Sequence, residues 1–271
     1  MAKASKLAKF LKNHPLCCFC GGMVQATTID HIPPKACFPR GLSPSTFEFP
    51  ACAQCNNGTA RDDAIFGYYS QLIDFNQSGR TSSDLERLRQ LHNDLINRYP
   101  QAIPDFGSIK PLYKIGSLYS PSPVAYSVQF QSYIYQTVLH VALAKLTHAL
   151  YYRETGKVLT PKHILTGITY QLQGRGAVLT DYLNMMLPVR RIATKENVHN
   201  YGNRFMYKFL YTADDDFFIY AVQFGLGLIM QGSTYGPDVR MPEDTLTNLP
   251  QVFAGQGPEF YRNIPFGVIS S

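Results

Sequence analysis

The sequence predicts an α+β protein, in which a small metal-organised domain precedes a larger domain with a long core helix and antiparallel strands. Three observations support this fold class. All six cysteines fall within the first 55 of 271 residues. Apolar residues then recur three and four positions apart between residues 124 and 154, and aromatic, β-prone segments follow from residue 204. We therefore expect domains at residues 1–75 and 124–271, joined by a helix and a Pro-rich connection at 76–123.

Composition narrows the class of protein further. A hydrophobic content of 45% predicts a packed core rather than a disordered chain. The net charge of +6 is uneven, because residues 1–40 hold six basic residues and one acidic residue. Attraction for phosphates should therefore concentrate at the amino-terminal end. The longest apolar stretch, residues 217–230, is too short to span a bilayer, so we expect a cytoplasmic protein with no membrane anchor.

The first half of the chain contains two predicted helices. Residues 1–13 place a lysine at every third position around Leu7, Phe10 and Leu11, which fits either a short basic helix or a solvated terminus. Ser83-Asp-Leu-Glu86 has the form of a capping box and predicts a helix that ends before Pro100. Its apolar face would carry Leu85, Leu88, Leu91, Leu95 and Ile96.

The second half contains the most periodic segment, from about Val124 to Glu154. It predicts a core helix that stops near Gly156, with His140 and His148 as ordinary core or surface histidines. The alternating residues 204–211 and the aromatic residues 217–230 predict an antiparallel hairpin with Asp214–Asp216 as a solvated tip. The apolar stripe of the core helix consists of Tyr135, Leu139, Ala142, Leu143, Leu146, Ala149 and Leu150.

Two Cys-x-x-Cys pairs predict a structural zinc site. Cys17 and Cys20 form the first pair, and Cys52 and Cys55 form the second, with 31 residues between the pairs. In a chain that is not exported, such pairs hold a metal rather than disulfides. Cys18 and Cys37 are then expected to be buried side chains and not ligands. Because four thiolates close the coordination shell of zinc, any catalysis must come from other residues.

Residues between and after the two pairs carry a second pattern. Asp30-His31-Ile-Pro33 lies between them, and Asn56 directly follows the second pair. This combination resembles the zinc-stabilised HNH endonucleases, which have a ββα-metal fold and a motif similar to that of phage endonuclease VII. The resemblance covers about residues 15–70.

The resemblance implies a site and a reaction. His31 would be the general base for phosphodiester hydrolysis, while Asp30 and Asn56 would bind a catalytic Mg²⁺ or Mn²⁺. The basic side chains of Lys35, Arg40 and Arg61 would contact phosphates. DNA is the expected partner, with RNA left open, and cleavage of both strands would favour a homodimer.

One departure from the family pattern leaves alternatives open. The asparagine that usually lies five to seven residues before the second knuckle is absent, because those positions read Ser45-Thr46-Phe47. A hydroxyl of Ser45 or Thr46 could orient the strand instead. The alternative is a non-catalytic zinc module that binds nucleic acid or protein. A further alternative keeps the nuclease and assigns sensing or partner docking to the carboxyl-terminal part.

Overall fold

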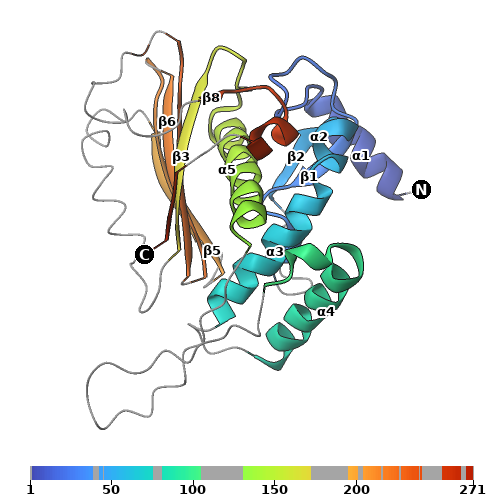
Figure 1. The fold of residues 1–271 in the computed structure, drawn as a ribbon. Helices are drawn as coiled ribbons and strands as arrows, with labels where there is room; N and C mark the ends of the chain where they lie inside the picture. The colour runs from blue at the N-terminus through green and yellow to red at the C-terminus, as the bar shows by residue number, and fades with distance from the viewer. Residues whose placement is uncertain are drawn as a thin grey trace.

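Helix α5 (Ser132–Thr155) lies at the centre of the protein because its surface is apolar on nearly all sides. One side packs against a large sheet, and the other packs against the amino-terminal elements (Figure 1). In this computed structural model, the described residues are 2–38, 43–44, 46–75, 81–104, 131–171, 195–200, 204–214, 216–225, 227–237, 239, 252–263 and 267–270. The predicted core helix is confirmed, and Gly156 ends it at a left-handed φ of 74°.

The amino-terminal part forms a two-stranded hairpin followed by helices. Helix α1 (Ala2–Asn13) precedes strands β1 (Thr28–His31) and β2 (Glu48–Ala51), which pair antiparallel. The short 3₁₀ helix η1 (Lys35–Cys37) lies between the strands, and helices α2 (Ala53–Asn57) and α3 (Ala60–Phe75) follow. Of the two alternatives for residues 1–13, the structure has the basic helix. The hairpin leads directly into the helix that carries the second cysteine pair.

Helix α4 (Ser82–Arg98) packs against α3, and the turn η2 (Pro100–Ala102) follows it. Its amino-terminal capping box consists of Thr81 and Asp84 and lies two residues before the predicted one, which began at Ser83. Leu91 and Leu95 are buried as predicted, but Leu85 and Ile96 are exposed. Residues 105–130, which include most of the predicted Pro-rich connection, lie outside the described residues.

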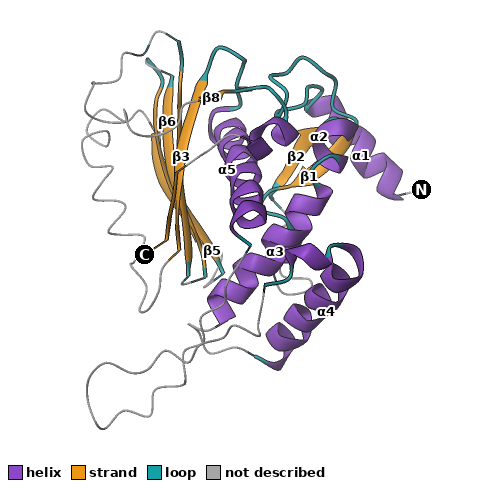
Figure 2. Cartoon of the chain, in the orientation of Figure 1, coloured by secondary structure: helices purple, strands orange, loops and turns teal. Residues whose placement is uncertain are grey.

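Within the described residues, the large sheet has seven strands (Figure 2). Their order is β4-β5-β6-β7-β3-β8, with β9 also pairing with β3. Only the β3–β9 pair is parallel among the described pairs. The turn η3 (Pro258–Asn263) follows β8 and packs against α5. The strand bounds are β3 Ile164–Gln171, β4 Lys195–Asn200, β5 Phe205–Thr212, β6 Phe217–Phe224, β7 Leu228–Tyr235, β8 Val252–Phe253 and β9 Gly267–Ser270.

The predicted hairpin is confirmed as β5 and β6, with two corrections. The segment 217–230 is two strands and not one, because Gly225 turns the chain at a φ of 54°. The turn between β5 and β6 is also not simply solvated. Asp214 is exposed, but Asp216 accepts hydrogen bonds from Tyr151 on α5 and from Tyr211 on β5.

Buried apolar residues from both halves of the chain form one contiguous core. It extends from Cys17 and Phe19 near the amino terminus, through α5, to Tyr261 in η3. The amino-terminal unit is therefore packed directly onto the rest of the protein. None of the helices in the described part of the chain is long and apolar enough to cross a membrane.

Candidate functional site

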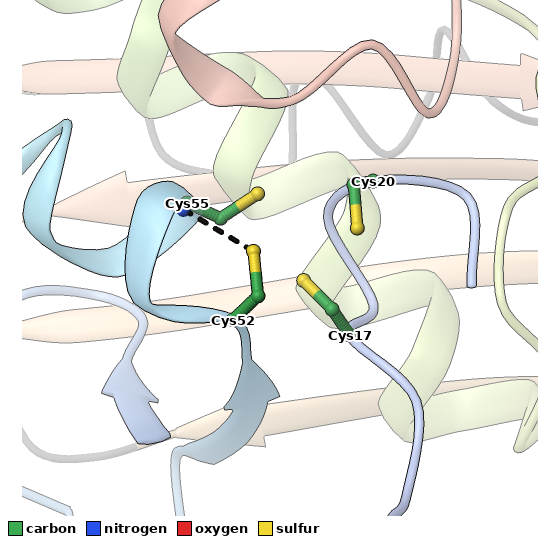
Figure 3. Close-up of side chains that lie close together, drawn as sticks. All are labelled: Cys17, Cys20, Cys52 and Cys55. Atoms are coloured by element: carbon green, nitrogen blue, oxygen red, sulfur yellow. Dashed lines mark hydrogen bonds between the residues drawn. The ribbon is translucent and has the colours of Figure 1, made fainter. Parts of the chain in front are cut away.

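The four predicted zinc ligands lie together. The sulfurs of Cys17, Cys20, Cys52 and Cys55 are all within 4.8 Å of one another, and all four cysteines are buried and free of disulfides. Figure 3 shows the two pairs facing each other from separate parts of the chain. Around a tetrahedral zinc ion, Zn–S bonds of about 2.3 Å would place the sulfurs about 3.8 Å apart. The residues therefore fit zinc, as the spacing predicts.

The backbone of α2 supports the second cysteine pair. Cys52 caps the start of α2, and its sulfur accepts a hydrogen bond from the backbone N–H of Cys55 at 3.4 Å. Hydrogen bonds from the thiols of Cys20 and Cys55 lower the pKa of Cys17 to about 2. The hydrogen bond with Cys17 raises the pKa of Cys20 to about 11. A bound metal would take all four cysteines as thiolates, because thiols lose their protons when they coordinate a metal ion.

The remaining two cysteines lie outside this cluster, as predicted. Cys18 and Cys37 are both buried. Burial raises the pKa of the Cys37 thiol to about 12, which makes it an inert part of the core. His148 is likewise a satisfied core histidine, with Nδ1 bonded to the Ala144 carbonyl oxygen and Nε2 accepting from the Gly255 N–H.

Asn56 ties the second cysteine pair to the hairpin. Its amide nitrogen donates to Oγ1 of Thr28 at 3.1 Å and to the carbonyl oxygen of Ile29 at 3.3 Å. Among the described residues, no hydrogen bond or ion pair joins Asn56 to Asp30. The side chain of Asn56 therefore lies beside β1, the strand that carries Asp30 and His31.

Asp30 is buried beneath α5. Its Oδ1 accepts the backbone N–H of His31 at 2.7 Å, and its Oδ2 lies 2.9 Å from Nζ of Lys145. The Lys145 ammonium also bonds Asp63 and Thr59 at the start of α3. Sequence reasoning missed Lys145, although a single lysine within the apolar stripe of a core helix was a visible signal.

His31 lies on the other side of β1, since neighbouring residues of a strand face opposite ways. Its cross-strand partner is Glu48, and Nε2 of His31 is 3.7 Å from Oε1 of Glu48. Burial, followed by the charge of Lys35, lowers the pKa of His31. The imidazole is therefore neutral near pH 7 and, with 26% of its side chain exposed, it remains accessible to solvent.

Of the basic side chains, Lys35 and Lys6 lie close enough to act on the pKa of His31, and no contact of the described residues joins Arg61 to His31. Lys6 on α1 pairs with Glu48 at 2.9 Å, which places the basic helix beside the hairpin. Lys35 is exposed, as is Arg61, whose guanidinium lies 5.6 Å from the ring centre of Tyr99. Arg40 lies outside the described residues.

The contacts of Asp30 and Asn56 do not fit a catalytic Mg²⁺ or Mn²⁺. These ions keep several water ligands, so they need a carboxylate oxygen that is open to solvent. Oδ2 of Asp30 is shielded from solvent and faces an ammonium group, while Oδ1 caps the backbone at His31. Asn56 directs its amide nitrogen at β1. Asp30 and Asn56 are thus engaged by other groups of the protein and do not form the pair of metal ligands expected from the sequence.

The chain was compared with protein-family models, with curated proteins and with solved structures, and nothing matched in any of the three. Fold and site together therefore define an α+β protein with four cysteines placed to hold a metal ion such as zinc.

Proposed function

We propose that this chain is a zinc-clamped endonuclease of the HNH type, which hydrolyses phosphodiester bonds of DNA with His31 as the general base. One observation carries the proposal. His31 is a neutral, solvent-accessible imidazole at the end of β1, in a hairpin-and-helix unit beside the four-cysteine cluster. A base of this kind needs a pKa below the working pH, and burial of His31 supplies it.

In the proposed reaction, His31 takes a proton from a water molecule while the water oxygen bonds to phosphorus. The bond between phosphorus and the leaving 3′ oxygen breaks, and that oxygen gains a proton from solvent. Lys35 and the basic helix α1 attract the phosphate backbone. Zinc holds the unit together and takes no part in the bond changes, because its four sulfur ligands leave no open position.

A plasmid-nicking assay with zinc-loaded protein tests the proposal. Because general base catalysis contributes roughly 10²- to 10⁴-fold, His31→Ala should reduce the nicking rate by at least about 100-fold. The matched control is His92→Ala, since His92 bonds Tyr68 at 2.9 Å and lies away from the hairpin. Equal rates for the wild type and H31A, at equal zinc content, would contradict the proposal. A parallel cleavage assay on single-stranded RNA measures the preference for DNA over RNA. Light scattering measures the oligomeric state, which is compared with whether the protein cuts one strand or both.

The engagement of Asp30 favours a second candidate function, a zinc-dependent nucleic-acid-binding module without catalysis. The carboxylate of Asp30 forms an ion pair with Lys145, and its Oδ2 is buried and not open to a metal ion. This module would bind DNA with an affinity that falls steeply with salt, because Lys6, Lys9, Lys12 and Lys35 are all exposed. Salt-dependent binding by a protein that never nicks DNA, with or without Mg²⁺ or Mn²⁺, would select this function.

A further inference from the structure

Lys145 is the most deeply buried charged side chain near the candidate site. Its side chain is 1% exposed, and α5 carries it to the point where β1 and α3 meet. Nζ lies 2.9 Å from Oδ2 of Asp30, 2.6 Å from Oδ2 of Asp63 and 2.9 Å from Oγ1 of Thr59. Three oxygen atoms from two separate elements therefore surround a single positive charge.

The charges within this group follow from its composition. One ammonium group faces two carboxylates, so it can fully neutralise only one of them. Burial alone would lower the pKa of Lys145, but the carboxylates of Asp63 and Asp30 outweigh burial and raise it, which keeps the ammonium charged. Burial raises the pKa of Asp63 to about 7, although Lys145 opposes the shift. The ammonium of Lys145 is thus the cation that faces the carboxylates of Asp30 and Asp63.

Lys145 also fixes the backbone that carries His31. Because Lys145 binds Oδ2 of Asp30, the other oxygen of the same carboxylate is held against the N–H of His31 at 2.7 Å. The ammonium therefore acts on the end of β1 through Asp30. Lys145 is a positioning residue, since Nζ is too deeply buried to touch a substrate.

We propose that the ammonium of Lys145 is the built-in cation of this site and occupies the place of a divalent ion at Asp30. The zinc-loaded protein then binds neither Mg²⁺ nor Mn²⁺ through this carboxylate. The inference rests on the proposed function only in taking Asp30 as part of the candidate site, where its carboxylate binds the backbone N–H of His31. It makes a claim about metal binding that is measured without any nucleic acid.

The test is a Mn²⁺ titration of the zinc-loaded protein, followed by the electron paramagnetic resonance signal of free Mn²⁺. Wild type and Asp30→Asn should bind the same small amount of Mn²⁺. Lys145→Met keeps an unbranched apolar side chain but removes the ammonium group, and it should gain one Mn²⁺ site per chain. That site should be lost in the double variant K145M/D30N, and Lys145→Arg, which keeps the charge, should not gain it.

Two results would overturn the inference. One is a wild-type Mn²⁺ site whose affinity falls by 10-fold or more in D30N, which would make Asp30 a metal ligand. The other is a folded, zinc-containing K145M that gains no Mn²⁺ site. If K145M does not fold, the comparison of wild type with D30N still decides. A protein that nicks no DNA but shows the expected Mn²⁺ pattern refutes the proposed function and leaves this inference standing.

Discussion

The guanidinium of Arg153 donates a hydrogen bond to the carbonyl oxygen of Thr46 at 3.0 Å and lies 4.3 Å from the ring centre of Phe47. The carbonyl oxygen of Phe47 in turn accepts the N–H of Ile32, which directly follows His31. The family resemblance calls for an asparagine near this position, and the chain has none. Arg153, from α5, instead holds the segment that enters β2 and so the end of β1.

Arg153→Met should loosen this segment. The substitution removes a hydrogen bond from a charged donor and a cation–π contact, so we expect a loss of about 1–3 kcal/mol in the free energy of unfolding. Urea denaturation measures it, and the imidazole NMR signal of His31 should shift or broaden. Arg98→Met is the control, because Arg98 is exposed and its pairing distance to Asp94 is 3.8 Å. Equal unfolding midpoints for the two variants would show that Arg153 holds nothing in place.

Removal of one zinc ligand should unfold the amino-terminal unit. Cys52→Ser should lose bound zinc and lower the melting temperature, because the metal would cross-link two chain segments that are 31 residues apart in the sequence. A hollow of about 540 Å³ beside Cys20, Cys52 and Cys55 gives a chelator access to the cluster, so chelation of the wild type should have the same effect.

Cys37→Ala is the matched control for the zinc prediction. Cys37 is as buried as the ligands but lies outside the cluster, so its variant should keep one zinc ion per chain. Its melting temperature should change only by what a small core truncation costs, about 1 kcal/mol. Zinc is measured with a colorimetric indicator after denaturation. A zinc content in C52S equal to that in C37A would rule out the four-sulfur site.

Features that depend on local spacing could be predicted from the sequence. The two cysteine pairs, the core helix around Leu139 and Leu146, and the β5–β6 hairpin follow from short-range patterns, and the structure confirms them. The four-cysteine cluster was predictable because each Cys-x-x-Cys pair forms a local knuckle, and a tetrahedral zinc site needs the four sulfurs of two such pairs.

Features that depend on distant partners could not be predicted in the same way. Nothing in the residues around Asp30 shows that Lys145 will bind its carboxylate, since the two meet only when α5 packs onto the hairpin. The same holds for Arg153 and Thr46. The predicted domain boundary at residue 75 rests on a change in composition. Composition carries no information about packing between distant segments, and in the structure the buried residues of both halves pack into one core.

His31 should titrate below the ordinary histidine pKa of about 6.5. Burial is the main cause, Lys35 adds to it, and Glu48 opposes it. Lys35→Gln should therefore raise the pKa of His31, while Glu48→Gln should lower it further. Since the folded-state pKa is lowered, the stability that His31 contributes is present above pH 6.5 and is lost as the pH falls through its folded-state pKa.

NMR titration of the His31 ring measures these shifts directly. If His31 is the general base, the acid limb of the nicking rate should move in the same direction as the ring pKa in both variants. A ring pKa at or above 6.5 in the wild type would contradict the burial argument. Shifts of the same sign in the two variants would contradict the charge argument.

Asp216 offers a test of how the sheet is joined to α5. Its carboxylate accepts hydrogen bonds from Tyr151 at 2.8 Å and Tyr211 at 2.9 Å, and it lies 3.0 Å from Nε2 of His163. Burial alone would raise the pKa of Asp216, but the bonds from His163, Tyr151 and Tyr211 outweigh burial and lower it. Its stabilising contribution is therefore complete above the ordinary pKa of about 3.9 and is lost as the pH falls through the folded-state value.

Asp216→Asn isolates this contribution, because asparagine tolerates the φ of 46° as well as aspartate does. We expect a loss of about 1–3 kcal/mol at pH 7, measured by urea denaturation, since the amide removes the negative charge that faces the donors of Tyr151, Tyr211, His163 and Lys157. Asp214→Asn is the control, as Asp214 is exposed, and it should change little. The gap between wild type and D216N should narrow as the pH is lowered from about 4 through the folded-state pKa of Asp216, because protonation of Asp216 then removes the same charge from the wild type. A gap that stays constant over that range would mean that shape, and not charge, holds this turn against α5.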